Sequence, residues 1–404
     1  MTAVGTEQGV SHEVSGVRLA AVKAGIRYAD RLDLVLIEIA PGSQSAAVFT
    51  GNAFCAAPVI VARENVQRAS TRYLLINTGN ANAGTGSDGV EVARRCCDEL
   101  ATLSRCRTEQ VLPFSTGVIG EPLPVDRLLA AMPGALEQLD ESNWLRAAQG
   151  IMTTDTKPKL VSRSIDIDNR KVAIGGIAKG AGMIRPNMAT MLAFIFTDAE
   201  IEQEYLQTLL RESVEDSFNR LTVDGDTSTN DSCVLTATGG SGAAIGPDHE
   251  ASNAFRRLLG EVFRELATAL IRDAEGATKF VSVIVTGGTD SAECLRVAYT
   301  VAESPLVKTA FFASDPNWGR ILAAVGRSEV EALDLDKVTI HLGATCIVSG
   351  GGRDRAYTEE SGQREMAASD IEIIIDLGRG KAQECVFTSD LSHDYVRINA
   401  EYRT

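Results

Sequence analysis

KGAGMIRPNMATMLAF, residues 179–194, joins a glycine-rich segment directly to a short apolar run. The stretch 173–189 is rich in glycine and contains one proline, so we expect a loop there. The apolar residues 191–196 have the length of a buried strand. This order places Thr190 at the first position of a strand that follows a loop.

Strand and helix patterns alternate on both sides of this stretch, with no repeat at a fixed period. The segments that predict strands include 73–77, 280–285, 371–376 and 395–398, and those that predict helices include 89–103, 206–218, 254–273 and 315–326. The interleaving favours a layered α/β sandwich, although the pattern does not give the order of the layers. At 404 residues, the chain is long enough for two interlocked lobes.

Two of the helical segments carry end signals. In 315–326 we expect Asp315 to cap the helix, Pro316 to take its first position and Gly326 to end it. The helix at 254–273 stops before the strand at 280–285, which places Glu275 in a helix-to-strand turn.

Composition narrows the class of protein. The net charge of −15 argues against nucleic acid as a partner, because binding a phosphate backbone requires a basic surface. The N-terminus lacks the pattern of a secretory signal, and no apolar run reaches the ~18 residues of a membrane span. The eight cysteines contain no CxxC pair, so we expect free thiols in the cytoplasm and no metal site.

Thr190 admits more than one interpretation. A threonine at the start of a strand is most often structural, and the glycines before it lack the spacing of a phosphate-binding loop. As a nucleophile its hydroxyl would need a base, and the chain has only four histidines, none near it in sequence. If the Ala189–Thr190 bond were cleaved, the new α-amine, with a reference pKa of about 8, would lie beside the hydroxyl.

The acidic segment DGDTSTND at 224–231 invites comparison with a calcium-binding loop. Such a loop needs glycine at its sixth position and glutamate at its twelfth, where this chain has Thr229 and Leu235. We therefore expect a polar turn, either solvated or lining a site.

KGAGMIRPNMATML resembles the self-cleavage and nucleophile motif of the ornithine acetyltransferase (glutamate N-acetyltransferase) family of arginine biosynthesis. The resemblance extends from about Val17 to Thr404. Its other segments are AAVFTGNAFCAAPV (46–59), NTGNANAGTG (77–86), LPFSTGVIGEPLP (112–124), GIMTTDT (150–156), DGDTSTND (224–231), DAEGATKF (273–280), SDPNWGRI (314–321) and the terminal INAEYRT.

This resemblance implies a self-processing N-terminal-nucleophile acyltransferase fold, cleaved between Ala189 and Thr190 into an α chain, 1–189, and a β chain, 190–404. Thr190 would be the nucleophile, with Thr116 and Gly117 forming an oxyanion hole. It also implies a heterotetramer of two α and two β chains. The residues implied in substrate binding, in addition to Thr190, are Thr153, Lys179, Glu275, Asn399 and Thr404.

The expected reaction transfers the acetyl group of N2-acetyl-L-ornithine to L-glutamate through an acetyl-Thr190 intermediate, without metal or organic cofactor. Acetyl-CoA is a plausible second donor. Two alternatives remain open at this point. One is a self-processing aminopeptidase or amidohydrolase with the same nucleophile, and the other is an unprocessed ligand-binding protein.

Overall fold

A computed structural model of the protein describes residues 13–185 and 191–402. The chain forms two compact units, each assembled from separate segments of the sequence. The first unit consists of Met1–Gly180, Pro186–Asn219 and Thr227–Leu270, and the second of Ala181–Arg185, Arg220–Asp226 and Ile271–Thr404.

The first unit contains two β-sheets. One has the strand order β1-β2-β4-β5 and the other the order β3-β10-β8-β7-β6. The strands of the first sheet are β1 (Val17–Val22), β2 (Leu34–Ile39), β4 (Tyr73–Asn80) and β5 (Val111–Val118). Those of the second are β3 (Gln44–Phe49), β6 (Lys159–Ile167), β7 (Arg170–Lys179), β8 (Leu192–Thr197) and β10 (Ser232–Ala237).

A continuous apolar core lies between these two sheets. Phe114 of β5 meets Phe194 of β8 edge to face, with ring centroids 5.0 Å apart. Trp144, on a short helix α4 (Trp144–Gly150), contacts Phe196 in the same way at 5.8 Å. Aromatic pairs of this geometry add to the free energy gained by burying apolar area, so they hold the two sheets face to face.

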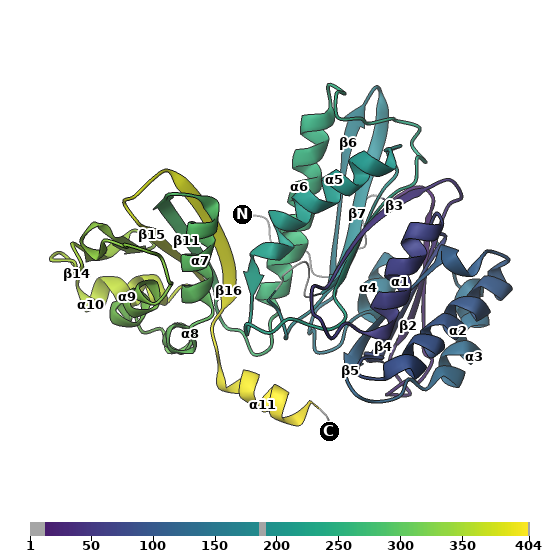
Figure 1. The fold of residues 1–404 in the computed structure, drawn as a ribbon, viewed down its shortest axis with the longest axis horizontal. Helices are drawn as coiled ribbons and strands as arrows, with labels where there is room; N and C mark the ends of the chain where they lie inside the picture. Colours follow the sequence, from purple (N-terminus) through teal and green to yellow (C-terminus); the bar gives the residue numbers. More distant parts are fainter. Residues whose placement is uncertain (1–12, 186–190, 403–404) are drawn as a thin grey trace. The chain divides into compact units, whose positions relative to one another are not determined.

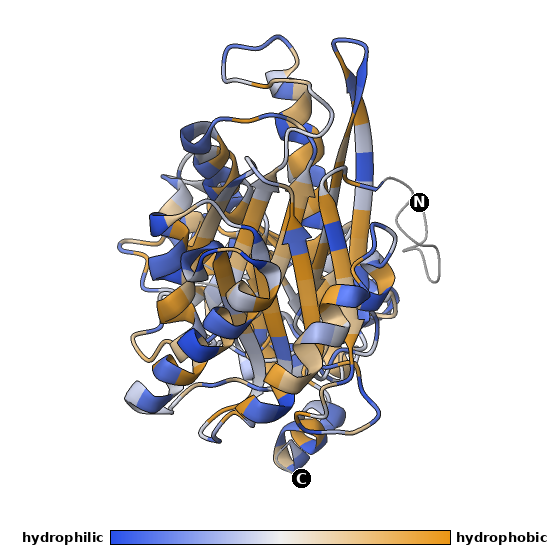
Figure 2. Ribbon diagram, turned by 90° about the vertical axis from the view of Figure 1, so that its right-hand side faces the viewer, coloured by the Kyte–Doolittle hydropathy of each residue, from blue (hydrophilic) through white to orange (hydrophobic). Residues whose placement is uncertain are grey.

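Helices cover the outer faces of both sheets. On the first sheet, α2 (Gly86–Ser104) and α3 (Val125–Glu137) bury their apolar residues against the outward-facing side chains of β2 and β4, and α1 (Ala57–Arg68) lies beside α2 and β5. On the second sheet lie α5 (Gln203–Glu215) and α6 (Ser252–Arg272). The first unit is therefore a helix–sheet–sheet–helix sandwich. In Figure 2 its strands are coloured mostly as hydrophobic residues.

The second unit is built on one mixed sheet with the order β14-β13-β12-β15-β11-β16-β9. Its strands are β9 (Leu221–Thr222), β11 (Phe280–Gly288), β12 (Thr339–Leu342), β13 (Thr345–Ser349), β14 (Gly352–Arg353), β15 (Asp370–Asp376) and β16 (Ala382–Ser389). Its helices are α7 (Ser291–Ala302), α8 (Pro305–Phe312), α9 (Trp318–Gly326), α10 (Glu359–Met366) and α11 (His393–Glu401) (Figure 1). The first four of these helices contribute residues to the core of the unit.

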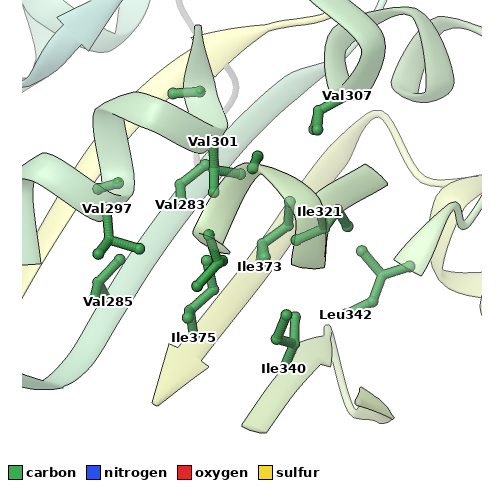
Figure 3. Packing of buried hydrophobic residues seen from close by; sticks show 14 of the residues in the cluster. Val283, Val285, Val297, Val301, Val307, Ile321, Ile340, Leu342, Ile373 and Ile375 are labelled. Atoms are coloured by element: carbon green, nitrogen blue, oxygen red, sulfur yellow. The ribbon is translucent and has the colours of Figure 1, made fainter. Parts of the chain in front are cut away.

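One face of this sheet packs against helices. Alternate residues of β11 and β15, such as Val283 and Ile373, point into the core beside Val297 of α7 and Ile321 of α9 (Figure 3). The exposed residues of β15 lie between the buried ones, which is the period-two pattern of a sheet with one buried face.

The predicted strands at 73–77, 191–196, 280–285 and 371–376 and the four predicted helices are present, each within a few residues of its expected ends. The predicted loop at 173–189 is wrong over its first part, because residues 173–179 belong to β7. The reason is packing: a side-chain carbon at Gly175 would lie 3.2 Å from Val14, and one at Gly176 would lie 3.0 Å from Ile195. These glycines allow close packing within a strand and do not form a turn.

Two predictions in the C-terminal region are corrected. Residues 395–398 form part of α11 and not a strand, because Ser392 caps a helix by accepting a hydrogen bond from the backbone N–H of Tyr395. The helix in 315–326 begins only at Trp318, and its cap is Asn317, which accepts from the N–H of Arg320. Asp315 and Pro316 therefore precede the cap.

The fragments 1–189 and 190–404 do not coincide with the two units. In the second sheet of the first unit, β3, β6 and β7 lie before Ala189 in sequence, whereas β8 and β10 lie after Thr190. Strand β7 pairs with β8, and β3 pairs with β10. The two strands of 190–404 therefore lie between strands of 1–189 within one hydrogen-bonded sheet.

All eight cysteines are free thiols. Within residues 13–185 and 191–402, the structure contains no helix that is both long enough and apolar enough to cross a membrane.

Candidate active site

Thr116 and Gly117 lie near the end of β5, where its pairing with β4 becomes irregular at Asn80. Gly117 has a φ of +136°, and a side-chain carbon there would lie 2.3 Å from the backbone carbon of Gly79. Only glycine fits this close approach of two strands. The result is a bend in which the backbone of Gly117 follows directly after the buried hydroxyl of Thr116.

Lys179, at the end of β7, contacts this hydroxyl. Its ammonium donates hydrogen bonds to Thr116 Oγ1 at 3.1 Å and to Thr153 Oγ1 at 2.8 Å. Lys179 is only 9% exposed, so these contacts form in a setting where electrostatic interactions are stronger than in water. The structure thus brings together three of the residues predicted from the sequence: Thr116, Thr153 and Lys179.

Asp155 binds the backbone next to two members of this group, Thr153 and Lys179. Its carboxylate accepts from Lys159 Nζ at 2.6 Å, from the N–H of Gly180 at 2.8 Å and from the N–H of Thr153 at 3.0 Å. Burial acts to raise the pKa of Asp155, but the charges of Lys179 and Lys159 and these hydrogen bonds outweigh it and lower the pKa. Asp155 is therefore an anion that fixes the backbone beside both Thr153 and Lys179.

Asp231 is the second buried acid of the first unit's site, and it behaves in the opposite way. It directly precedes β10, and burial raises the pKa of its carboxyl well above the usual range, against hydrogen bonds from Ser228 and the charge of Lys179. Among the described residues, its Oδ2 has no hydrogen-bond partner. Burial therefore disfavours the ionised form of Asp231, and one of its oxygens has no hydrogen-bond partner in the described part of the chain.

The polar turn 224–231 ties several segments of the first unit to this site. Asn230 Nδ2 donates to the carbonyl of Ser115 at 2.9 Å and to that of Ala81 at 2.6 Å. The backbone N–H of Ala56 donates to the carbonyl of Thr229 at 2.8 Å. The turn therefore holds the residue directly before Thr116, which is a role that the acidic motif alone did not reveal.

In the second unit, Glu275 and Asn399 form a separate pair. Asn399 Nδ2, on α11, donates to Glu275 Oε2 at 2.7 Å, and Glu275 is 8% exposed. A side-chain carbon at Gly182 would lie 2.4 Å from the same carboxylate oxygen, so glycine is needed to let Glu275 approach the backbone there. As predicted, Glu275 lies between a helix, α6, and a strand, β11.

Asp224 holds the segment 181–185, which leads toward the predicted cleavage site. It accepts from the backbone N–H groups of Met183 at 2.7 Å and Ile184 at 2.9 Å, and from Tyr395 Oη at 3.2 Å. Burial, followed by the charge of Asp224, raises the pKa of Tyr395. The motif 224–231 thus serves the second unit through its first residue and the first unit through its last ones.

Three predicted residues, Ala189, Thr190 and Thr404, lie outside the described residues. Their neighbours are defined: the carbonyl of Met191 accepts from the N–H of Ser232 at 2.9 Å, which joins the start of β8 to the start of β10. Among the described residues, no group of three His, Cys, Asp or Glu side chains has the arrangement of a metal site.

The sequence did not single out Asp155, Asn230 or Asp231, although each lies within a quoted motif. GIMTTDT contains the first and DGDTSTND contains the other two. A lone polar residue gives no signal of burial, since burial depends on strands that are distant in sequence.

Comparison with known proteins gives consistent matches over nearly the whole chain. A family model described as the ArgJ family matches residues 18–404. The arginine biosynthesis bifunctional protein ArgJ of Pseudomonas syringae pv. tomato is 55% identical over 397 residues, covering 97% of each chain. That of Methylococcus capsulatus is 55% identical over 392 residues, covering 97% of this chain and 96% of the relative.

A solved structure is also similar. The crystal structure of the arginine biosynthesis bifunctional protein from Bacillus halodurans is 37% identical, covers 51% of this chain and 97% of that chain, and has a TM-score of 0.49.

Proposed function

The chain belongs to the ArgJ family, and on that premise we propose that it transfers the acetyl group of N2-acetyl-L-ornithine to L-glutamate. The products are L-ornithine and N-acetyl-L-glutamate, so the enzyme is an acetyltransferase of arginine biosynthesis. The observation in the structure that best supports this activity is the buried hydroxyl of Thr116, contacted by the Lys179 ammonium and followed by Gly117.

The nucleophile in this proposal is Thr190, exposed as an N-terminal residue by self-cleavage after Ala189. Leu192 and Phe194 point into the core between the two sheets, where Phe114 of the Thr116 strand also lies. Thr190 lies two residues before Leu192 in the sequence.

Covalent catalysis divides the exchange into two acyl transfers. The α-amine of Thr190 takes the hydroxyl proton as the oxygen attacks the acetyl carbon, and then gives a proton to the departing nitrogen of ornithine. The α-amine of glutamate next attacks the acetyl-Thr190 ester, and N-acetylglutamate leaves. In both steps negative charge develops on the acetyl oxygen, which the hydroxyl of Thr116 and the N–H of Gly117 would stabilise.

We assign substrate binding to Thr153, Lys179, Glu275, Asn399 and Thr404, as the resemblance implies. The ammonium of Lys179 can pair with a carboxylate of the substrate. The carboxylate of Glu275 can pair with the distal ammonium of ornithine, and Asn399 already orients one oxygen of Glu275. The reaction needs no metal or organic cofactor, because the nucleophile and its base are on the chain itself. Acetyl-CoA is a second acetyl donor in this proposal.

We also infer that the fragments 1–189 and 190–404 stay together after cleavage and form a heterotetramer of two α and two β chains. Their shared sheet supports their association, because separation would break the pairing of β7 with β8 and of β3 with β10. Eight free thiols fit a reducing compartment, and we place the enzyme in the cytoplasm.

An assay of acetyl transfer tests this function. We expect purified protein incubated with acetylornithine and glutamate to yield ornithine and N-acetylglutamate in equal amounts. Release of free acetate alone, with or without glutamate, would instead identify a hydrolase of the aminopeptidase type. Binding of acetylornithine without turnover by an uncleaved chain would identify a ligand-binding protein.

A further inference from the structure

Lys308 of α8 is a buried lysine that takes no part in the reaction proposed above. It is 2% exposed, and its Nζ donates to Thr388 Oγ1 at 2.8 Å and to the carbonyl of Ser389. Lysine is rarely this buried, because removing an ammonium from water costs free energy. Burial lowers the pKa of Lys308 to about 7, although nearby carboxylates act to raise it. An apolar side chain of equal length would avoid this cost, so a role other than packing is expected.

Lys308 fixes the segment 388–391, where β16 ends and the chain turns toward α11. Its ammonium binds residues 388 and 389, and its backbone carbonyl accepts from the N–H of Leu391 at 3.2 Å. Thr388 Oγ1 also donates to the carbonyl of Ala302, at the end of α7, at 3.2 Å. One residue of α8 therefore binds both ends of this segment.

Within the segment, Asp390 reaches the turn that carries Glu275. Its Oδ1 accepts from the backbone N–H groups of Thr278 at 2.8 Å and Lys279 at 2.9 Å, and its Oδ2 accepts from Thr278 Oγ1 at 2.6 Å. Thr278 follows Glu275 by three residues. Hydrogen bonds to a carboxylate are stronger than those to a neutral acceptor, so Asp390 holds this backbone firmly. The placement of Glu275 therefore depends on the placement of Asp390.

The same segment leads into α11, which carries Asn399. Ser392 caps that helix, and a side-chain carbon at Gly276 would lie 2.6 Å from Ser392 Oγ. The residue directly after Glu275 thus packs on the start of α11. Further along the helix, Asn399 donates to Glu275 Oε2 at 2.7 Å. Both members of the pair are therefore reached from the segment that Lys308 holds.

We propose that Lys308 is a positioning residue, which holds Glu275 and Asn399 where the carboxylate of Glu275 meets the distal ammonium of ornithine. Lys308 acts through the segment 388–391, and the substrate itself is bound by Glu275. The inference rests on the proposed function, which assigns Glu275 to ornithine. Hydrogen bonds weaken steeply when their geometry is disturbed, so loss of the lysine should weaken binding of acetylornithine and leave that of glutamate unchanged.

The test compares wild type with Lys308→Met, which fills a similar space but donates no hydrogen bonds. Thermal unfolding first establishes that the variant is folded. We expect KM for acetylornithine to rise by about 10-fold, roughly the effect of losing one hydrogen bond to a charged group, with little change in kcat or in KM for glutamate. Calorimetric titration with L-ornithine measures the same subsite without turnover, and its Kd should rise by a similar factor. A smaller fraction of folded protein would instead lower the rate with both substrates and leave both KM values unchanged.

A double-mutant cycle separates positioning from general disturbance. If Lys308 acts through Glu275, then adding Lys308→Met to Glu275→Gln should raise KM for acetylornithine little further, because the contact is already lost. Additive effects of the two changes, equal effects of Lys308→Met on the two substrates, or wild-type KM values in that variant would each overturn the inference.

Lys279→Met is a matched control. Lys279 belongs to the same unit, and its Nζ also binds backbone carbonyls, those of Met366 at 3.0 Å and Ala368 at 2.9 Å, at the end of α10. We expect wild-type KM values from this variant for both substrates.

If Lys308→Met does not fold, Thr388→Val decides, because it removes one of the two acceptors that bind the lysine. A rise in KM for acetylornithine alone supports the inference, whereas wild-type KM values overturn it. Absence of acetyl transfer by wild type would refute the proposed function itself, independently of any variant.

Discussion

The ammonium of Lys179 donates a hydrogen bond of 3.1 Å to the hydroxyl oxygen of Thr116. A hydroxyl group has a single proton, and accepting a bond from Lys179 orients that proton away from the ammonium. Thr116 is then set to donate toward an acyl oxygen, with its acidity increased by the adjacent positive charge. This contact adds a role for Lys179 to the substrate binding that the sequence predicts.

Replacing Lys179 tests that role. Lys179→Met keeps the apolar stem and removes the charge, and we expect kcat to fall by roughly 100- to 1,000-fold, as for loss of an oxyanion donor. Lys171→Met is the control, since Lys171 is an exposed residue of the same strand. Steady-state rates with acetylornithine and glutamate measure both. A rise in KM alone, with kcat unchanged, would restrict Lys179 to binding substrate.

The backbone at Gly117 is predicted to tolerate no side chain. Gly117→Ala forces a carbon to within 2.3 Å of Gly79 at a positive φ, so we expect a loss of roughly 2 kcal/mol or more in the free energy of unfolding. Gly134→Ala is the matched change, because a carbon at this position in α3 meets nothing within 4 Å. That variant should gain about 0.5–1 kcal/mol. Chemical denaturation compares the two, and equal effects would refute the packing described here.

The two buried acids of the first unit should give opposite pH dependences. The pKa of Asp155 is lowered on folding, so its stabilisation is present above its unfolded value of about 4 and is lost as pH falls toward the folded value. The melting temperature of wild type should therefore exceed that of Asp155→Asn at pH 7, and the difference should shrink below about pH 4.

Asp231 has a raised pKa, so the folded state holds a proton that the unfolded state releases above about pH 4. Wild type should lose stability relative to Asp231→Asn as pH rises from about 4 toward 7. Thermal unfolding across this pH range measures both variants. Parallel curves for the two would contradict the opposite directions of the two pKa shifts.

Glu275 should discriminate between the two amino-acid substrates. Glu275→Gln keeps the contact with Asn399 possible but removes the charge that pairs with the distal ammonium of ornithine. We expect KM for acetylornithine to rise by about 10-fold or more, with little change for glutamate. Glu372→Gln, at an exposed position of β15, serves as control. Equal effects on both substrates would place Glu275 outside the ornithine subsite.

The sequence predicted most elements because their apolar periodicity is local. It failed at residues 173–179, where Gly175 and Gly176 lie in a strand whose close neighbours, Val14 and Ile195, leave little space for a side chain. It also failed at 395–398, where Ser392 starts a helix and its hydrogen bond outweighs the strand preference of Tyr395 and Val396. In each case a contact beyond the local pattern decided the structure.

Some residues of the candidate site could be predicted from the sequence and others could not. The resemblance named Thr116, Thr153 and Lys179, and the structure brings them together in the first unit. It also named Glu275 and Asn399, which form a pair in the second. Asp155 and Asp231 could not be predicted, because two aspartates in polar motifs give no indication that the folded structure lowers the pKa of one and raises the pKa of the other.

The intact mass of the purified protein, before and after incubation with acetylornithine alone, tests the central claim most directly. We predict two fragments, of 189 and 215 residues (404 − 189 = 215), with the larger one gaining one acetyl group, and a Thr190→Ala variant that stays whole and inactive. A wild-type chain that remains a single polypeptide while transferring acetyl groups at full rate would contradict the account.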